Sequence, residues 1–192
     1  MQISHLRRVA KIHAAALAGD FLPSLGVDFL HTFYRAALSS GAAFGFVLLQ
    51  SDLPAGFVLG SADTDALFRR VLFRAPLALA WAGLPAILRQ PRLLEKVAET
   101  FLYPHREAVT PVKAELVVIA VEPECRSQGA GHALVQALNT VFQAQGVVAY
   151  KVTVLQSNSG ANRFYQREGF NIAGEFELYH KRWNLYTLSL ER

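Results

Sequence analysis

The stretch Glu115–Leu134, ELVVIAVEPECRSQGAGHAL, decides the fold of this chain. Its apolar, β-branched run from Leu116 to Val121 predicts a buried strand, which Pro123 ends. A glycine-containing turn follows, and the apolar spacing from Ala133 onward predicts a helix. A strand, a glycine turn and a helix in this order point unpaired backbone N–H groups and the positive end of a helix dipole at one place. The stretch therefore predicts a site for a phosphate or pyrophosphate.

The spacing of the glycines excludes two common classes of phosphate-binding motif. A dinucleotide fingerprint would have a third glycine three residues after Gly131, but position 134 is Leu. The Gly-Lys-Ser/Thr of a P-loop is absent from the turn. Residues 126–131 read R-x-x-G-x-G, which resembles the pyrophosphate-binding turn of the GCN5-related N-acetyltransferases (GNAT). The resemblance implies that this turn holds the pyrophosphate of acetyl-coenzyme A.

A second block of sequence supports the resemblance. Val152–Leu155 predicts a strand, and Asn158–Tyr165 predicts a helix that closes at Gly169, where a left-handed residue is favoured. These residues spell N-x-x-A-x-x-F-Y-x-x-x-G-F, which is similar to the second signature of the family. The resemblance is specific over residues 114–170 and general elsewhere.

The resemblance implies an α/β (α+β) fold with a central, mixed, mostly antiparallel sheet flanked by helices, in one domain over residues 1–192. Helical patterns at about 4–18 and 28–38, strand patterns at 44–50 and 56–61, and two closing strands after Phe170 agree with it. The family normally begins with a strand. Only Met1–Ser4 is available for one here, so we expect that first strand to be short or missing.

Residues from about 63 to 104 form an insertion of helical pattern between the family's third and fourth strands. The insertion is too apolar for disorder, and its charge comes largely from arginines at positions 69, 70, 74, 89 and 92. Three interpretations are open. The helices could pack over the domain's own sheet, form a lid or wall of the acceptor pocket, or present a basic amphipathic surface to a membrane or partner.

Composition limits the setting in which the protein acts. A formal charge of +4 and a pI near 9.4 suit an anionic cofactor but are too weak to indicate nucleic-acid binding. One cysteine excludes an internal disulfide and, with no signal-peptide pattern, favours the cytoplasm. The apolar run Ala75–Leu88 is shorter than the roughly 20 residues of a membrane span. We therefore expect no transmembrane segment, with peripheral membrane contact still open.

The resemblance also implies which residues contact acetyl-CoA. Backbone groups of the strand would hold the thioester and the pantetheine arm, and the turn would hold the pyrophosphate. Asn158 could bond the pantetheine amide, cap its own helix, or do both. His132 could add a donor to phosphate or lie in solvent. The expected set is Ile119, Ala120, Val121, Arg126, Ser127, Gln128, Gly129, Ala130, Gly131, His132, Asn158 and Tyr165, with no metal ligands.

Acetyl transfer to an amine requires the amine to lose a proton and the leaving thiolate to be stabilised. The resemblance implies Tyr165 as the acid near the sulfur, although the ring could instead only pack its helix against the sheet. It implies Glu115 as the base, although this side chain could be a solvated carboxylate at a strand edge. Thr153 stands where other branches of the family place a base and cannot serve. Reserves for the base are Glu122, Glu177, His180 or a chain of waters.

The resemblance thus implies an acetyl-CoA-dependent N-acetyltransferase that acts by direct attack of a primary amine in a ternary complex. The alternatives are a non-catalytic CoA- or acyl-CoA-binding module and an acyltransferase with a longer acyl donor. An aromatic wall favours a small-molecule amine, such as an amino sugar, over a protein acceptor. The insertion and the last strands could support a homodimer. The expected wall is Phe21, Phe29, Tyr34, Trp81, Tyr103, Tyr179 and Trp183.

Overall fold

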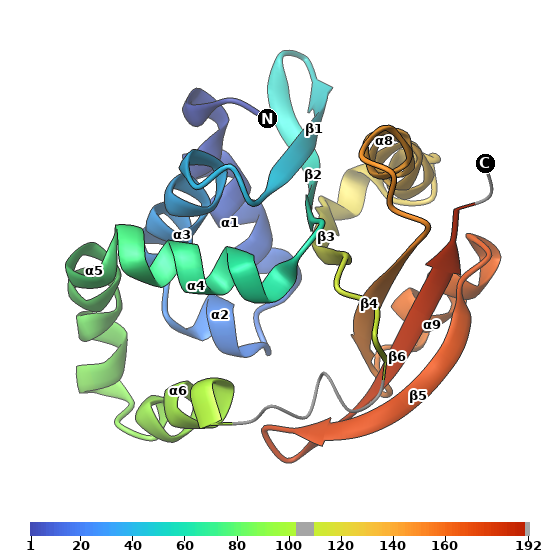
Figure 1. Ribbon diagram of the computed structural model, residues 1–192. Coiled ribbons are helices and arrows are strands. Elements are labelled where there is room, and N and C mark those ends of the chain that lie inside the picture. The colour runs from blue at the N-terminus through green and yellow to red at the C-terminus, as the bar shows by residue number, and fades with distance from the viewer. Residues whose placement is uncertain (103–109, 191–192) are drawn as a thin grey trace.

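The computed structural model describes residues 1–102 and 110–190. Its strands form one sheet in the order β1-β2-β3-β4-β6-β5 (Figure 1). Only β3 and β4 run parallel, and every other neighbouring pair is antiparallel. The predicted mixed, mostly antiparallel sheet is therefore confirmed. The strands are β1 (Phe44–Gln50), β2 (Leu53–Ser61), β3 (Glu115–Val121), β4 (Ala149–Leu155), β5 (Asn171–Leu178) and β6 (Lys181–Ser189).

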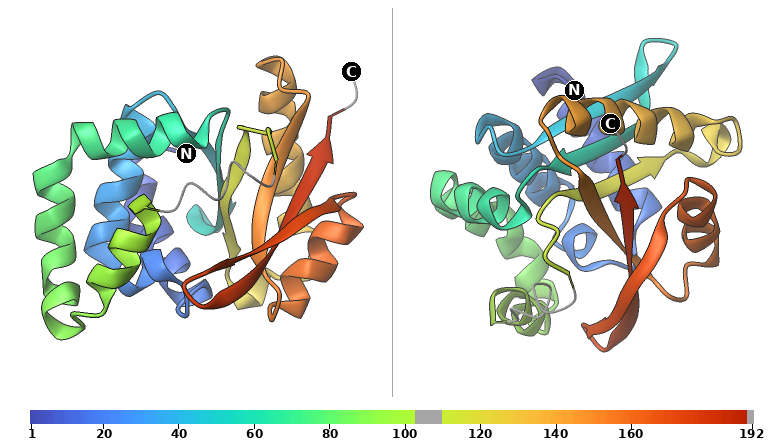
Figure 2. Two further views of the ribbon diagram at one scale, coloured as in Figure 1. Left: turned by 60° about the horizontal axis from the view of Figure 1, so that its bottom comes forward. Right: turned by 45° about the vertical axis from the view of Figure 1, so that its right-hand side comes forward.

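Helices cover both faces of the sheet, because each of the long ones has one apolar side (Figures 1 and 2). On one face, α1 (Leu6–Ala16) and α3 (Val27–Ser39) bury their apolar sides against β2 and β3. On the other face, α8 (Ala130–Ala144) packs across β1, β2 and β3, and α9 (Ser159–Arg167) packs against β4. A short helix, α2 (Phe21–Ser24), follows α1. The sheet therefore separates two apolar clusters.

The family's usual first strand is missing from the described residues before α1, as expected. The chain instead enters α1 through a short 3-10 turn, Ile3–His5. The backbone nitrogen of Met1 donates to the Gly45 carbonyl at 2.7 Å, which ties the start of the chain to β1.

The insertion is helical, as predicted, and consists of α4 (Thr64–Arg74), α5 (Pro76–Arg89) and α6 (Leu93–Leu102). Asp63 caps α4 by accepting from the Ala66 amide at 2.8 Å. Helices α4 and α5 pack on α3 rather than over the sheet, and Leu67, Val71 and Leu79 join the core on that side. The last part of the expected insertion, 103–104, lies outside the described residues.

No single helix among the described residues is long and apolar enough to cross a membrane. Helices α4 and α5 reach that length and composition only together, and they meet at a bend of 89°.

Strand β3 has two irregularities that matter for the site. Its register with β2 shifts between Leu59 and Gly60, which leaves Val117 as an extra, bulged residue. Its pairing with β4 is confined to Glu115 and Lys151. From that point to their carboxyl ends, β3 and β4 have no pairing with each other, and the sheet opens between them.

Candidate active site

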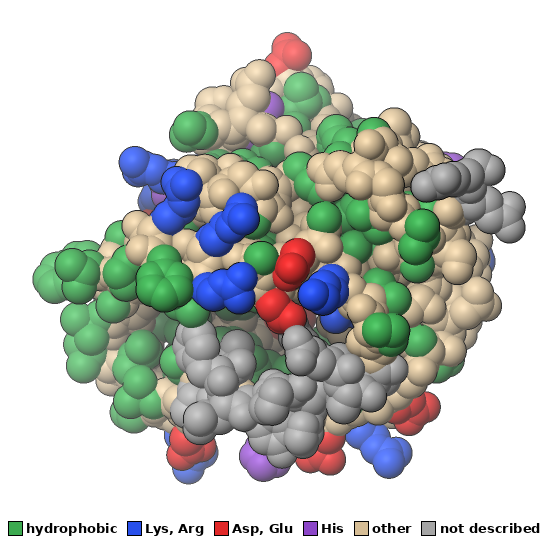
Figure 3. All heavy atoms as spheres, viewed as in Figure 1, with side chains coloured by type: hydrophobic (Ala, Val, Ile, Leu, Met, Phe, Trp, Pro, Cys, Tyr) green, Lys and Arg blue, Asp and Glu red, His purple; other side chains and the backbone are tan. Residues whose placement is uncertain are grey.

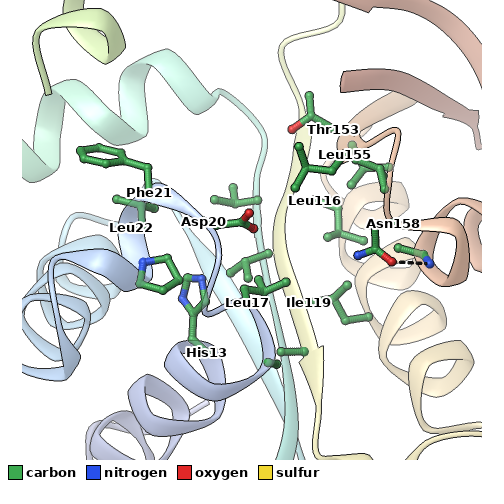
Figure 4. Close-up of a pocket in the computed structure, with 18 of the residues that line it drawn as sticks. His13, Leu17, Asp20, Phe21, Leu22, Leu116, Ile119, Thr153, Leu155 and Asn158 are labelled. Atoms are coloured by element: carbon green, nitrogen blue, oxygen red, sulfur yellow. Dashed lines mark hydrogen bonds between the residues drawn. The ribbon is translucent and has the colours of Figure 1, made fainter. Parts of the chain in front are cut away.

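A cavity of about 1710 Å³ extends from the opening between β3 and β4 to the loop that joins α1 and α2 (Figure 4). Its lining includes most residues of β3 and the end of β4. The turn before α8 and the start of α9 close one side, and α1, α5 and the end of β5 close the other. The two blocks found in the sequence thus meet at one cavity.

The backbone of β3 presents free hydrogen-bonding groups to this opening. The Glu122 amide donates to the Ala55 carbonyl at 2.8 Å, so by the alternation of an antiparallel ladder Ile119 and Val121 face away from β2, toward β4. The Val121 carbonyl accepts from Arg126 Nε at 3.0 Å, which agrees with this orientation. The same alternation turns the backbone of Ala120 toward β2. The expected backbone contacts with the cofactor therefore narrow to Ile119 and Val121.

The turn before α8 has the geometry of an anion site. Gly129, the N-cap of α8, has φ of +78°, a left-handed conformation, and a Cβ built there would meet nothing within 4 Å. Ser127 is also left-handed, with φ of +61°. The amides of residues 127–132 donate to no acceptor within the described part of the chain. Consecutive free amides at the N-terminus of a 15-residue helix fit a pyrophosphate.

Not every residue of the turn faces the cavity. Arg126, Ser127, Gly129, Ala130, Gly131 and His132 line it. Gln128 does not, because its side-chain amide donates to the Glu124 carbonyl at 2.9 Å.

Two contacts join the start of α8 to α9. A Cβ at Gly131 would lie 3.0 Å from the ring of Phe164, so this glycine allows the two helices to approach. His132 Nδ1 lies 2.8 Å from a carboxylate oxygen of Glu168, at the end of α9. The second glycine of the turn therefore has a packing role that the motif alone did not indicate.

Tyr165 brings a side-chain hydroxyl group to the cavity. Its side chain extends from α9 into the cluster around β4 and lines the cavity, although only 5% of the residue is exposed. Its hydroxyl has no hydrogen-bond partner among the described residues. Burial raises the pKa of Tyr165, so the hydroxyl stays protonated at neutral pH and can donate.

Asn158 caps α9, because its Oδ1 accepts from the Ala161 amide at 3.1 Å (Figure 4). It also lines the cavity, so a contact with the cofactor stays a prediction. At the other end of the helix, Gly169 is left-handed with φ of +87°, and the Phe170 amide donates to the Tyr165 carbonyl at 3.0 Å. These bonds form the predicted glycine C-cap.

Asn162 does not line the cavity, but it positions the helix that does, and the sequence motif did not predict this role. Its amide nitrogen donates to the carbonyls of Leu155 at 2.9 Å and Asn158 at 2.7 Å. Its amide oxygen accepts from Asn184 at 2.7 Å and from the Tyr186 hydroxyl at 2.9 Å. One side chain therefore fastens α9 to the end of β4 and to β6, which fixes where Tyr165 stands. Asn162 occupies a variable position of N-x-x-A-x-x-F-Y, so the motif could not predict this role.

The structure does not bring Glu115, the expected base, to the cavity. Glu115 begins β3 at the closed end of the opening, is 3% exposed, and is not among the lining residues. Its Oε2 is buried and has no hydrogen-bond partner among the described residues. It is therefore not the solvated carboxylate of the alternative interpretation either.

Of the three side chains named as alternative bases, only Glu177 lines the cavity. Glu122 is occupied by an ion pair with Arg8 at 2.6 Å. His180 lies in the β5–β6 turn, outside the lining. Glu177 lines the cavity, as does Thr153 of β4.

Two titratable groups on the α1 side of the cavity were not expected from the sequence. The carboxylate of Asp20, in the loop after α1, points into the cavity toward β3 (Figure 4). Burial raises the pKa of Asp20, and Lys181 and Lys96 partly offset the effect. His13 of α1 also lines the cavity, and its Nδ1 lies 2.6 Å from the buried Tyr34 hydroxyl. Burial lowers the pKa of His13 to about 4, so its ring is neutral.

The wall opposite β3 and β4 is built by segments far apart in the sequence. The rings of Phe21 and Tyr179 lie 5.3 Å apart, and the Tyr179 amide donates to Glu99 of α6 at 2.8 Å. Lys181 Nζ donates to the Gly19 carbonyl at 2.9 Å. The insertion therefore forms part of the wall of this cavity, and its role at an acceptor pocket stays a prediction.

Only some residues of the predicted aromatic wall line the cavity. Phe21, Phe29, Tyr179 and Trp183 line the cavity. Tyr34 does not, because it is fully buried against His13 in the core, and Trp81 does not, because it lies on the outer side of α5 with 78% of its surface exposed. Tyr103 lies outside the described residues.

Comparison with known proteins supports the resemblance to the GNAT family. Residues 94–172 match the family model of the acetyltransferase (GNAT) domain. The match confirms the resemblance read from the two blocks and indicates acetyl transfer in general. No curated protein sequence matches the chain. Within the described residues, no group of three or more His, Cys, Asp or Glu side chains could hold a metal ion.

Solved structures share the fold over the whole chain. SsHAT has a TM-score of 0.66 at 21% identity, over 100% of this chain and 96% of its own. An N-acetyltransferase from Staphylococcus aureus Mu50 has a TM-score of 0.64 at 15% identity, over 100% and 96%. The ribosomal-protein-S18-alanine N-acetyltransferase from Escherichia coli has a TM-score of 0.61 at 18% identity, over 100% and 92%.

Proposed function

Because the chain carries a GNAT acetyltransferase domain, we propose that it transfers an acetyl group from acetyl-CoA to the primary amine of a small molecule. The observation that carries this proposal is the open edge of β3. The free amides of Ile119 and Val121 lie along one cavity with the anion turn before α8 and the hydroxyl of Tyr165. These are the three contacts that a long, anionic thioester needs.

Acetyl-CoA supplies an activated acetyl group, and the protein's residues position it. The amides of the 127–132 turn bind the pyrophosphate, and the unpaired amides of Ile119 and Val121 donate to the pantetheine arm and the thioester carbonyl. Tyr165 donates to the sulfur as the carbon–sulfur bond breaks. Overall, the acceptor's ammonium group loses two protons, and the new carbon–nitrogen bond forms as the carbon–sulfur bond breaks. One of these protons ends on the sulfur, which leaves as a thiol, and the other is released to solvent.

We propose Asp20 as the group that receives the acceptor amine. Its carboxylate faces β3 across the cavity, whereas Glu115 does not line the cavity. A carboxylate attracts the ammonium form of the amine, and a raised pKa makes it a better proton acceptor. Glu177 is the second candidate, because it lines the same cavity.

The walls suit an acceptor with an apolar or ring-shaped body and a cationic group. Phe21, Tyr179 and Trp183 offer faces for stacking, and Asp20 and Glu99 bring negative charge. We therefore keep an amino sugar as the favoured class over protein N-termini and lysines. The cavity is also large enough to accommodate a longer acyl chain, so a longer acyl donor is the alternative reaction.

The decisive variant for this proposal is Tyr165→Phe. Thiol release from acetyl-CoA should be measured with a panel of amino sugars, aliphatic diamines and peptides. We expect turnover by the native chain, and a loss of about 100-fold in kcat with little change in acetyl-CoA affinity for the variant. Tyr150→Phe is the matched control, because its hydroxyl bonds to Asn139 at 2.7 Å and Tyr150 does not line the cavity.

Two results would contradict the proposal. If the native chain binds acetyl-CoA but acetylates no acceptor, the chain is a binding module. If peptides outcompete every small amine, the acceptor class is wrong although the reaction is right.

A further inference from the structure

Helix α5 exposes a continuous apolar stripe to solvent. Leu77, Trp81, Leu84 and Leu88 repeat at the spacing of one helix face, and the first, second and fourth are 83%, 78% and 72% exposed. We name these four residues the α5 stripe. Figure 3 shows hydrophobic side chains gathered at the left, where Figure 1 places α5. Single exposed apolar residues are ordinary, but a contiguous row of large ones marks an interaction surface.

The packing of the rest of the helix keeps the stripe exposed. The opposite side of α5 is well packed, because Leu79 and Gly83 are buried. A Cβ at Gly83 would lie 3.3 Å from the ring of Phe29, so α5 sits close against α3. Rotation of the helix to bury Trp81 would expose that packed side. The sequence APLALAWAGLPAIL is therefore apolar on both sides for different reasons.

The segment that carries the stripe has charged residues of one sign only. From Ala66 to Leu94 the chain has no Asp or Glu, but it has arginines at 69, 70, 74, 89 and 92. Arg74 precedes α5, and Arg89 and Arg92 follow the stripe, so exposed cations stand at both ends of it. None of the five arginines forms an ion pair within the described ranges.

We propose that the α5 stripe and its flanking arginines dock the protein on an anionic lipid surface. Leucine and tryptophan side chains would enter the boundary of the acyl chains, and the arginines would contact the acidic headgroups. A helix of 14 residues is about 21 Å long, too short to span a bilayer, so it would lie in the plane of the surface.

A second copy of the chain fits this surface less well. A two-fold contact through the stripe would bring the arginines at its ends toward those of the other copy, with no acidic residue between 66 and 94 to pair with them. An anionic lipid surface satisfies both the apolar and the cationic parts. The proposal does not depend on the reaction that the cavity catalyses.

Co-sedimentation with lipid vesicles tests this proposal on the full chain. We expect binding to phosphatidylcholine vesicles that contain phosphatidylglycerol, and weak binding to phosphatidylcholine alone. Leu77→Gln/Leu88→Gln should lower the partition coefficient at least about tenfold. Arg89→Gln/Arg92→Gln should lower it by about fivefold per arginine on the anionic vesicles only. The matched control is Leu53→Gln/Val148→Gln, which changes residues that are 62% and 68% exposed elsewhere.

Trp81 gives a second readout that does not depend on sedimentation. The chain has two tryptophans, so in a Trp183→Phe background the emission reports Trp81 alone. Its spectrum should shift to the blue on anionic vesicles. The proposal is overturned if the native chain does not bind anionic vesicles, or binds neutral ones equally well. It is also overturned if Leu77→Gln/Leu88→Gln leaves vesicle binding unchanged. The same holds if the native chain forms a dimer that does not bind lipid and this double variant abolishes the dimer.

Discussion

Asp20 is the residue on which acceptor binding should depend most. Its carboxylate faces β3 from the opposite wall, and it lies in a loop between two helices that no motif marks. Asp20→Asn keeps the shape and removes the charge. We expect kcat/KM for the acceptor to fall by about 100-fold or more, with acetyl-CoA affinity retained, because the anion turn lies elsewhere.

Asp52→Asn is the matched control for that measurement. Asp52 is exposed in the β1–β2 turn, with φ of +63°, a conformation that asparagine tolerates well. If Asp20→Asn and Glu177→Gln lower kcat/KM equally, neither carboxylate alone is the base, and a water molecule bound by both would take the proton. An unaffected Asp20→Asn enzyme would remove Asp20 from the reaction.

His13 should make the stability of the fold depend on pH. Burial lowers the pKa of His13 from 6.5 to about 4. Between these two pH values, His13 is protonated in the unfolded chain but neutral in the folded chain. The neutral ring therefore contributes fully to the free energy of unfolding above pH 6.5, and this contribution is lost as the pH falls toward 4. The loss should reach on the order of 3 kcal/mol in the free energy of unfolding.

Urea unfolding of the native chain and of His13→Gln, from pH 7 to pH 4.5, isolates this effect. Glutamine can still bond to the Tyr34 hydroxyl but cannot titrate. We expect the difference in unfolding free energy between the two proteins to change with pH below 6.5. Parallel curves would show that the buried imidazole is not responsible.

At the scale of the element, helix α9 is held in place by Asn162. Asn162→Ala would leave the carbonyls of Leu155 and Asn158, and the donors of Asn184 and Tyr186, without their partner. We expect a loss of about 2–4 kcal/mol in unfolding free energy, and a higher KM for acetyl-CoA as Tyr165 shifts.

The matched control on the same helix is Gln166→Ala, because Gln166 is exposed. It should change the free energy of unfolding by less than about 0.5 kcal/mol. If Asn162→Ala is as stable as this control, the network does not fix the helix.

Elements that depend on local signals could be predicted from the sequence. The apolar run of β3, the glycine turn and the capped helix α9 were each confirmed, because strand propensity, left-handed glycines and N-caps act over a few residues. Helix α2 was missed, since four residues carry no periodicity. The positions of Asp20, His13 and Asn162 depend on tertiary packing, and nothing local marks them.

At the scale of the whole molecule, the insertion connects the helices on the α1 side of the cavity with the β5–β6 turn. Helix α6 reaches the β5–β6 turn through Glu99, and α5 contacts α3. The sequence showed that the insertion is helical and cationic, but not which side of it faces inward. Trp81 illustrates the limit, because a tryptophan in an apolar helix was expected in the wall and lies on the outer surface.

The central claim is that the turn before α8 binds the pyrophosphate of acetyl-CoA, and isothermal titration tests it most directly. The chain offers a matched pair of variants, Gly129→Glu and Gly146→Glu. Both glycines are left-handed, with φ of +78° and +73°, and both have open space at Cβ, but Gly146 follows the far end of α8.

We expect the native chain and Gly146→Glu to bind acetyl-CoA in the same range. Gly129→Glu should lose binding by about 100-fold, because a carboxylate beside the free amides repels the pyrophosphate. If the folded native chain binds no acetyl-CoA, or if both variants weaken binding equally, the turn is not the cofactor site and the account is contradicted.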